Sequence, residues 1–235
     1  MIAKQRDDRT VAQHLQCIQA EVEAWSSCQG SQYVVRLEGL YEDAEHVMLV
    51  QELCSGGDLR SVLKRGQLTE FETAQVMRAV LDVVHECHSQ GILYGDVFMA
   101  PEQWQGGSLG LASDIWAAGV MMYQLLSGRF PFWADVPAEQ VDGQGAGLAL
   151  YKVVCAIQSN PVLLTGAPWD RVSRPCKDLL CAMLDRQPST RISAHAALHH
   201  SWFRQQLGQV PAVRSPALQP EQSGTYDPDD YSVSS

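Results

Sequence analysis

Histidine and cysteine are the residue types in this sequence that could bind a transition metal. His195 and His199 are four residues apart, a spacing at which two imidazoles on one helix face can grip zinc. No carboxylate or cysteine stands near them in the sequence to serve as a third ligand. The seven cysteines form an odd set without a CxxC pair, which indicates neither a disulfide framework nor a zinc site. We expect packed histidines and reduced, mostly buried thiols.

The elements that position these side chains are predicted from the spacing of apolar residues. Val11, Leu15, Ile18, Val22 and Trp25 recur every three or four residues, which predicts an amphipathic helix. Residues 33–53 then form two short β-rich runs, YVVRLEGLYED and HVMLVQEL, around a polar turn at 42–45. This pattern predicts a hairpin after the first helix.

Most of the remaining sequence has a helical pattern. Thr69 and Glu72 form a capping box that opens a helix from about Glu70 to Ser89. The run DIWAAGVMMYQLLSG is apolar nearly all round and ends at Gly128, which is typical of a helix buried in the centre of a domain. Helices are also expected at 148–157, at 175–184 and after Ser193, whose hydroxyl can cap the next segment.

Three motifs stand in the second half of the chain: MAPE at 99–102, SDIWAAGVMMYQLLSGRFPFW at 113–133 and LDRQPSTRISAHAALHHSWF at 184–203. In residue type, order and spacing they resemble eukaryotic protein kinases, and they are most similar to the calcium/calmodulin-dependent group and its plant and algal calcium-dependent relatives. The resemblance covers residues 2–203 and implies an α+β, protein-kinase-like two-lobe fold. Residues 1–54 would form a truncated, small β-rich N-lobe and residues 55–207 a mainly α-helical C-lobe. The Pro-, Ser- and Asp-rich residues 208–235 are expected to be a disordered acidic tail.

The resemblance implies two structural contacts in the C-lobe. Glu102 of the MAPE motif is expected to pair with Arg191. Asp114, in the buried helix, is expected to brace the catalytic loop from beneath.

The resemblance also implies where a nucleotide would bind. Lys4 resembles the strand lysine that holds the α and β phosphates, and Glu21 falls where the first long helix supplies its carboxylate partner. A solvated amine at a frayed terminus is the alternative for Lys4.

VQELCSGGDL resembles the hinge between the lobes, with Gln51 as its gatekeeper. The backbone groups of Glu52 and Cys54 would contact the adenine of ATP, and the side chain of Asp58 would contact its ribose. The same residues also suit a linker without a ligand.

Asp96 is the candidate catalytic carboxylate, because HSQGILYGDV resembles the run in which the HRD aspartate orients the acceptor hydroxyl. Here the triplet reads Tyr94, Gly95 and Asp96. The missing arginine would leave an activation-loop phosphate without a cationic partner at this position, so regulation by loop phosphorylation is not expected.

The stretch ILYGDVFMAPEQW joins two motifs that kinases keep apart. About forty residues normally separate them, and these include the asparagine and the DFG aspartate that hold magnesium. Here six steps lead from Asp96 to Glu102, with the deletion at 96–99, so no metal-holding residue is assigned. Only three residues precede Lys4, where a Gly-rich loop is expected. The upper lobe would keep about three strands and a helix, with sheet edges and an apolar face partly uncovered.

Three interpretations follow. The chain could be a degenerate kinase, or pseudokinase, that acts as a docking module and transfers no phosphate. It could be an active Ser/Thr kinase represented by an incomplete gene model or splice form. An unrelated helical protein would require all three motifs to be coincidences. The resemblance implies ATP and Mg²⁺ as cofactors and a protein substrate or docking partner.

Composition excludes several other partners. A net charge of −10 argues against nucleic acid, because backbone phosphates are bound by clustered Lys and Arg. The longest apolar run, 115–126, is roughly half of the ~20 residues in a membrane span, and the first ten residues lack a signal-peptide core. No DxDxDG loop is present, so we expect no EF-hand. These features predict a cytoplasmic protein that does not enter a membrane.

Overall fold

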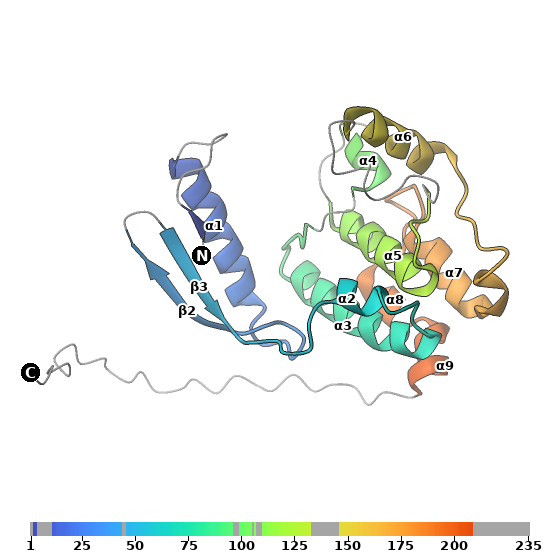
Figure 1. Cartoon of the computed structure of the whole chain (residues 1–235), viewed down its shortest axis with the longest axis horizontal. Coiled ribbons are helices and arrows are strands. Elements are labelled where there is room, and N and C mark those ends of the chain that lie inside the picture. Colours follow the sequence, from blue (N-terminus) through green and yellow to red (C-terminus); the bar gives the residue numbers. More distant parts are fainter. Residues whose placement is uncertain are drawn as a thin grey trace, which may run out of the picture.

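The computed structural model describes residues 2–3, 11–43, 46–95, 99–104, 106, 110–132 and 146–208. The chain forms two lobes (Figure 1): a small lobe with one helix and a three-stranded sheet, and a larger lobe of helices. A single linker after the last strand leads from the small lobe into the large one. This is the α+β two-lobe architecture that the sequence predicted. Lys4, Asp96 and the acidic tail from residue 209 lie outside the described residues.

The small lobe contains the predicted helix and hairpin. Its elements are β1 (Ile2–Ala3), α1 (Val11–Ser27), β2 (Leu37–Glu42) and β3 (His46–Gln51). The sheet order is β1-β3-β2 with antiparallel pairing throughout, so β3 is central. Strand β3 has bonded neighbours on both sides because the hairpin brings it beside β2 and the amino end adds β1.

The sequence predicted a partly uncovered apolar face, and exposed apolar side chains lie on both faces of this sheet. Leu40, Tyr41 and Val50 are 53%, 60% and 45% exposed. Apolar side chains at such exposure gain little from burial, which is worth about 1.5–3 kcal/mol for a fully buried side chain. Ile18 of α1 and Val47 of β3 are buried. The small lobe therefore has a thin core and contributes little to the stability of the chain.

The large lobe follows the linker and is helical throughout its described part. Its elements are α2 (Leu59–Leu63), α3 (Glu70–Ser89), α4 (Pro101–Trp104), α5 (Leu111–Ser127), α6 (Ala146–Ser159), the 3-10 turn η2 (Trp169–Arg171), α7 (Arg174–Met183), α8 (Ala194–Leu198) and α9 (Ser201–Leu207). The segment after Ser193 forms two short helices, α8 and α9, which meet at His199 and His200.

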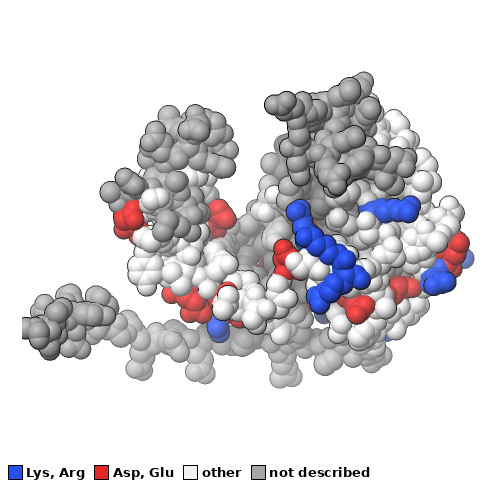
Figure 2. Space-filling model, viewed as in Figure 1, with Lys and Arg blue, Asp and Glu red and all other residues white. Residues whose placement is uncertain are grey.

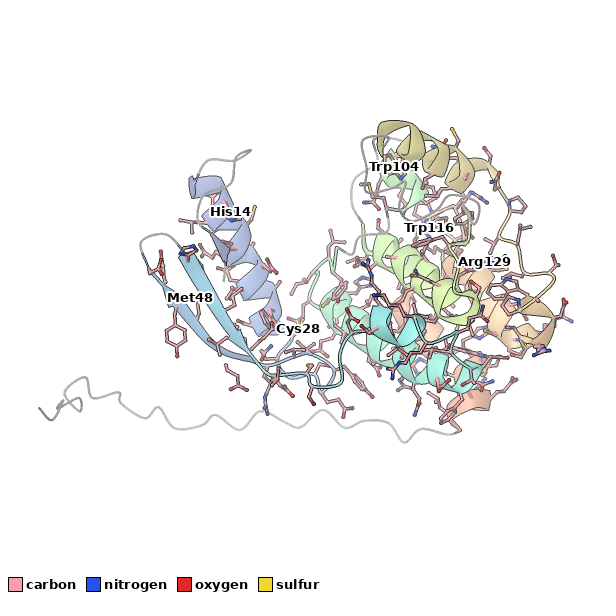
Figure 3. The ribbon with its side chains drawn as sticks, in the orientation of Figure 1. His14, Cys28, Met48, Trp104, Trp116 and Arg129 are labelled. Carbon is pink, nitrogen blue, oxygen red and sulfur yellow. The ribbon has the colours of Figure 1, made fainter. Side chains whose placement is uncertain are left out.

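Helix α5 is the centre of the large lobe, as its apolar sequence predicted. Trp116, Met122 and Leu125 are fully buried, and Trp116 lies inside the lobe below α4 (Figure 3). The helix packs against α3 and α7. It ends at Gly128, whose φ of 67° is the left-handed conformation that glycine adopts without a steric penalty.

The start of α3 connects distant parts of the large lobe. Thr69 and Glu72 form the predicted reciprocal capping box. The carboxylate of Glu70 accepts hydrogen bonds from the backbone and hydroxyl of Ser173 and from the indole of Trp202, at 2.8, 2.7 and 2.8 Å. The first turn of α3 thus holds α7 and α9 in place, which its sequence alone did not indicate.

The candidate metal ligands of the sequence lie beside other histidines. The ring centroid of His195 is 5.4 Å from that of His85 and 4.4 Å from that of His199, and both His195 and His199 are exposed. The packing interpretation stays a prediction. The expectation of mostly buried thiols was wrong: Cys28, Cys87 and Cys176 are buried, whereas the other four are exposed or half-buried. Cys17, Cys54 and Cys181 lie on surfaces that face solvent. The spacing of cysteines in the sequence does not show which of them are buried and which are exposed.

Membrane spanning needs a long apolar helix. Across the described ranges, no helix combines the length and hydropathy to do so.

Candidate functional site

The loop after α3 is held from below by Asp114. This residue lies in the first turn of α5 and is buried. Its carboxylate accepts hydrogen bonds from the backbone N–H groups of Tyr94 and Gly95 at 3.0 and 2.9 Å, and it lies 2.8 Å from His88 Nε2. The structure therefore confirms the brace that the resemblance implied.

The same contacts determine the charge of Asp114. Burial alone would raise the pKa of Asp114, but the hydrogen bonds from His88, Tyr94 and Gly95 outweigh it and hold this pKa below its usual value. The carboxylate is therefore ionised at neutral pH. An ionised acceptor makes stronger hydrogen bonds than a neutral one, which fixes the loop up to Gly95. Asp96 follows directly in the sequence, but it lies outside the described residues, so its catalytic role stays a prediction.

A second buried contact fixes helix α4. Arg191 donates to both carboxylate oxygens of Glu102, at 2.7 and 2.9 Å, which confirms the predicted pair. The guanidinium also donates to the carbonyls of Ala112 and Asp185, both at 2.7 Å, and lies 5.2 Å from the ring centroid of Trp116. The Arg191 side chain therefore connects α4, α5 and the loop after α7, and it stabilises their packing in the large lobe.

Both carboxylate oxygens of Glu102 are occupied by the ion pair with Arg191. Burial alone would raise the pKa of Glu102, but the hydrogen bonds from Arg191 lower it below the usual value. The Glu102 side chain is 15% exposed, and that of Arg191 is fully buried. Both oxygens accept from the guanidinium, so the group has a structural role.

The linker carries three of the predicted nucleotide-binding residues, and all three are exposed. Glu52 bonds through its backbone N–H to Arg36 O at 2.9 Å, and its carboxylate lies 3.5 Å from Arg36 Nε. Cys54 is a free thiol on the surface. Asp58 caps α2 by accepting from Ser61 N at 2.7 Å, and hydrogen bonding to Ser61 lowers the pKa of Asp58. A ribose contact would have to share Asp58 with this cap.

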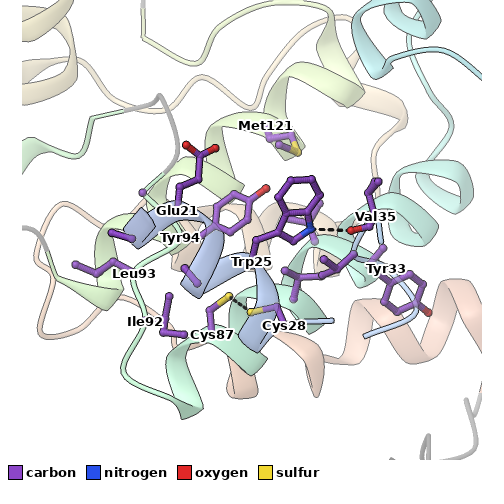
Figure 4. A pocket seen from close by; sticks show the side chains of 17 residues that line it. Glu21, Trp25, Cys28, Tyr33, Val35, Cys87, Ile92, Leu93, Tyr94 and Met121 are labelled. Atoms are coloured by element: carbon purple, nitrogen blue, oxygen red, sulfur yellow. Dashed lines mark hydrogen bonds between the residues drawn. The ribbon is translucent and has the colours of Figure 1, made fainter. Parts of the chain in front are cut away.

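Glu21 lies on α1 at a cavity between the lobes (Figure 4). The side chain is exposed, so its carboxylate is hydrated. Its predicted partner, Lys4, is outside the described residues, and the Lys4–Glu21 pair stays a prediction. Glu21 lines this cavity, whereas Glu52, Cys54 and Asp58 do not.

The cavity between the lobes has a volume of about 810 Å³. Its walls come from α1, the turn before β2, α3, the braced loop and Met121 of α5. Most of the lining is apolar, with the Trp25 indole donating to Val35 O at 2.7 Å. Tyr94 lines it at the position of the missing HRD histidine. Sequence reasoning missed this cavity because its residues are scattered over both lobes, although the helical pattern had placed Trp25 on the apolar face of α1.

Charge is distributed unequally between the lobes. Residues 11–54 contain seven Asp or Glu and one arginine, Arg36. The large lobe carries Arg60, Lys64 and Arg65 exposed on and just after α2, and Figure 2 shows most of the basic side chains of this view on the large lobe, with acidic side chains on both lobes. Negative charge on the lobe that would cover a nucleotide repels its phosphates.

Comparison with known proteins agrees with this geometry. The protein kinase domain family matches residues 1–98 and 96–203, in two stretches that meet where the sequence motifs are joined. The chain is 30% identical to calcium-dependent protein kinase 2 of Oryza sativa subsp. japonica, over 83% of this chain and 43% of that protein. It is 31% identical to calcium-dependent protein kinase 8 of the same plant, over 79% of this chain and 40% of that protein.

A third relative is calcium-dependent protein kinase 25 of Arabidopsis thaliana, which is 29% identical over 80% of this chain and 41% of that protein. The chain spans about two fifths of the length of these curated relatives. With the family matched along most of the sequence, and with the braced loop and the Glu102–Arg191 pair in place, this chain belongs to the protein kinase family and resembles its calcium-dependent serine/threonine members.

Proposed function

We propose that the chain, as its sequence stands, is a kinase-like docking module of the serine/threonine class that transfers no phosphate. The observation that carries this proposal is the spacing of six steps between Asp96 and Glu102. Kinases place their magnesium-holding asparagine and aspartate in this interval. Residues 1–54 would serve as the partial N-lobe and residues 55–207 as the C-lobe.

The residues present do not fit a magnesium site of the kinase kind. Magnesium prefers carboxylate and other oxygen ligands in an octahedral arrangement. The five residues between Asp96 and Glu102 are Val, Phe, Met, Ala and Pro, which offer no side-chain oxygen. Glu102 has both oxygens bonded to Arg191. In the described parts of the chain, no group of three His, Cys, Asp or Glu side chains could hold a metal ion.

The features that remain are those of a scaffold. Asp114 and Arg191 keep the large lobe in the family arrangement without using a nucleotide. The small lobe offers exposed Leu40, Tyr41 and Val50 to a protein partner. These features support protein docking as the role of the chain, and a cytoplasmic location is part of the proposal.

Thermal unfolding with ATP, with Mg²⁺ and with both tests the proposal. A ligand at 100 times its Kd stabilises the folded state by about 2.7 kcal/mol, a rise of roughly 5–10 °C in Tm for a chain of this size. We expect no rise beyond that given by Mg²⁺ alone. An intact calcium-dependent kinase domain, titrated in the same way, shows that the conditions detect binding. A magnesium-dependent rise for this chain, lost in Asp96→Asn, would contradict the proposal.

An active kinase that lacks an internal segment is the second candidate. The alignment with the rice kinase 2 runs over 236 positions but takes in 83% of this 235-residue chain, so about forty positions have no residue here. To test this candidate, the corresponding segment of that kinase is inserted between Phe98 and Met99, its Gly-rich loop is added before Lys4, and phosphate transfer to a mixed peptide substrate is measured. Activity of the chimera, lost in Asp96→Asn, would favour the second candidate. An inactive but cooperatively folded chimera would favour the docking module.

A further inference from the structure

Two buried thiols meet where the small lobe joins the large lobe. Cys28 directly follows α1, and Cys87 lies in the last turn of α3. Their Sγ atoms are 3.3 Å apart, and the residues are 5% and 4% exposed. Figure 4 shows the two side chains pointing at each other, and Figure 3 places Cys28 at the end of α1 that faces the large lobe. A disulfide has an S–S length near 2.05 Å, so the sulfurs need to approach by about 1.2 Å.

The pair is buried from bulk solvent but borders the cavity between the lobes. Cys28 and Cys87 both line this space of about 810 Å³. A molecule as small as a peroxide fits there many times over. The neighbouring contact from Gln90 Nε2 to Ser27 O, at 3.5 Å, holds the end of α1 over the end of α3. The two sulfurs are therefore in contact beside a space that a small oxidant can occupy.

We propose that Cys28 and Cys87 form a redox modification site, at which a hydroperoxide converts the two thiols into a disulfide that links the small lobe to the large lobe. This inference does not depend on the docking role, because it needs only the observed contact between Cys28 and Cys87. The other buried thiol, Cys176, lies elsewhere in the large lobe and has no cysteine partner among the residues the structure describes.

The reaction balances in two steps. The thiolate of one cysteine attacks a peroxide oxygen, the O–O bond breaks, and a sulfenic acid forms with release of water or an alcohol. The second thiol attacks the sulfenic sulfur, forms the S–S bond and expels water. The two thiols together lose two protons and two electrons, which the hydroperoxide takes up. A cellular dithiol such as reduced thioredoxin reverses the reaction by thiol–disulfide exchange.

The surroundings of Cys87 make this reaction slow at neutral pH. Burial raises the pKa of Cys87 well above its usual value, and the nearby Cys28, Asp114 and Glu86 raise it further. Because the thiolate is the reactive form, oxidation should accelerate as pH rises from 7 to 9. The site would therefore respond to sustained oxidant and not to a brief pulse.

The expected consequence is a restrained angle between the lobes. The bond would close a loop through both strands of the hairpin, the linker and most of α3. A loop of this length, about 60 residues, restrains the unfolded chain strongly, and we expect the Tm of the oxidised chain to rise by about 5–10 °C. Dithiothreitol should return it to the starting value.

Peptide mapping of the full chain tests the proposal. The purified reduced protein is treated with excess hydrogen peroxide, denatured, alkylated with a mass-labelled maleimide and digested. We expect a peptide that joins Cys28 to Cys87 and separates on reduction. Seven alkylated thiols, a different pairing of Cys28, or sulfinic acid at either position would overturn the proposal.

Two matched variants define the site. Cys17→Ser changes an exposed cysteine of α1 and should leave the linked peptide and the Tm rise unchanged. Cys28→Ala should abolish both, and its folding is checked by the Tm of the reduced protein. If Cys28→Ala does not fold, mapping of the unaltered chain still decides the outcome. A Tm rise that persists in a folded Cys28→Ala variant would also overturn the proposal.

Discussion

Replacement of Arg191 by methionine tests the most concentrated set of contacts in the large lobe. The guanidinium makes a bidentate pair with Glu102, bonds two carbonyls and stacks on Trp116, and its side chain has no exposed surface. Removing one partner of a buried ion pair costs about 3–5 kcal/mol, because the other charge is left without compensation. Glu102 is 15% exposed and can recover some hydration, so we expect a loss of about 3 kcal/mol for Arg191→Met.

Urea denaturation followed by tryptophan fluorescence measures this loss. With an m value of about 2–3 kcal/mol per molar urea, the midpoint should fall by about 1 M or more. Arg174→Met is the matched control, because Arg174 is 92% exposed and lies 3.9 Å from Asp178. An exposed pair at this distance contributes about 0–0.5 kcal/mol. Similar midpoint shifts in both variants, or a loss below about 1 kcal/mol for Arg191→Met, would refute this reasoning.

A double-mutant cycle separates the pair from the other contacts of Arg191. Glu102→Gln keeps the shape but removes the charge, and it should cost about 1–3 kcal/mol. The double variant should cost less than the sum of the two single variants, because either change alone already breaks the ion pair. Additive losses would show that the carbonyl bonds and the Trp116 contact carry the stability.

Three further predictions concern the braced loop, a helix cap and the packing of α5. Asp114→Asn should lower the free energy of unfolding by about 1–3 kcal/mol at pH 7. Because the folded-state pKa of Asp114 is depressed, the stability that its carboxylate contributes is complete above about pH 5 and is lost as pH falls through and below 3.8. The urea midpoints of the unaltered chain and the variant should therefore converge in acid. Thr69→Ala removes the capping oxygen of α3 and should cost about 1 kcal/mol in the same assay, whereas a midpoint equal to that of the unaltered chain would show that Glu72 suffices. Gly119→Ala would place a Cβ 2.9 Å from Leu184 Cδ2 and 3.0 Å from Met183 Cβ, and we expect a loss of about 1–3 kcal/mol; a gain would mean that α5 and α7 separate readily.

Local sequence patterns predicted most of the elements correctly. The capping box at Thr69, the left-handed Gly128 and the β-rich runs around the polar turn of the hairpin act over a few residues, so their consequences are local. The family motifs added the long-range pairs Glu102–Arg191 and Asp114 with the loop at Tyr94 and Gly95. These pairs joined segments that no local pattern relates.

The sequence alone determined the class of the protein, the two-lobe α+β architecture and the short interval between Asp96 and Glu102, whose five residues carry no side-chain oxygen. Only the tertiary structure decided which cysteines are buried, that Glu70 joins α3 to α7 and α9, and that Cys28 meets Cys87 across the lobes. Helix periodicity shows which face of an element is apolar, but the partner of that face depends on the angles at which the elements pack. Contacts between residues far apart in the chain are therefore a property of the folded molecule.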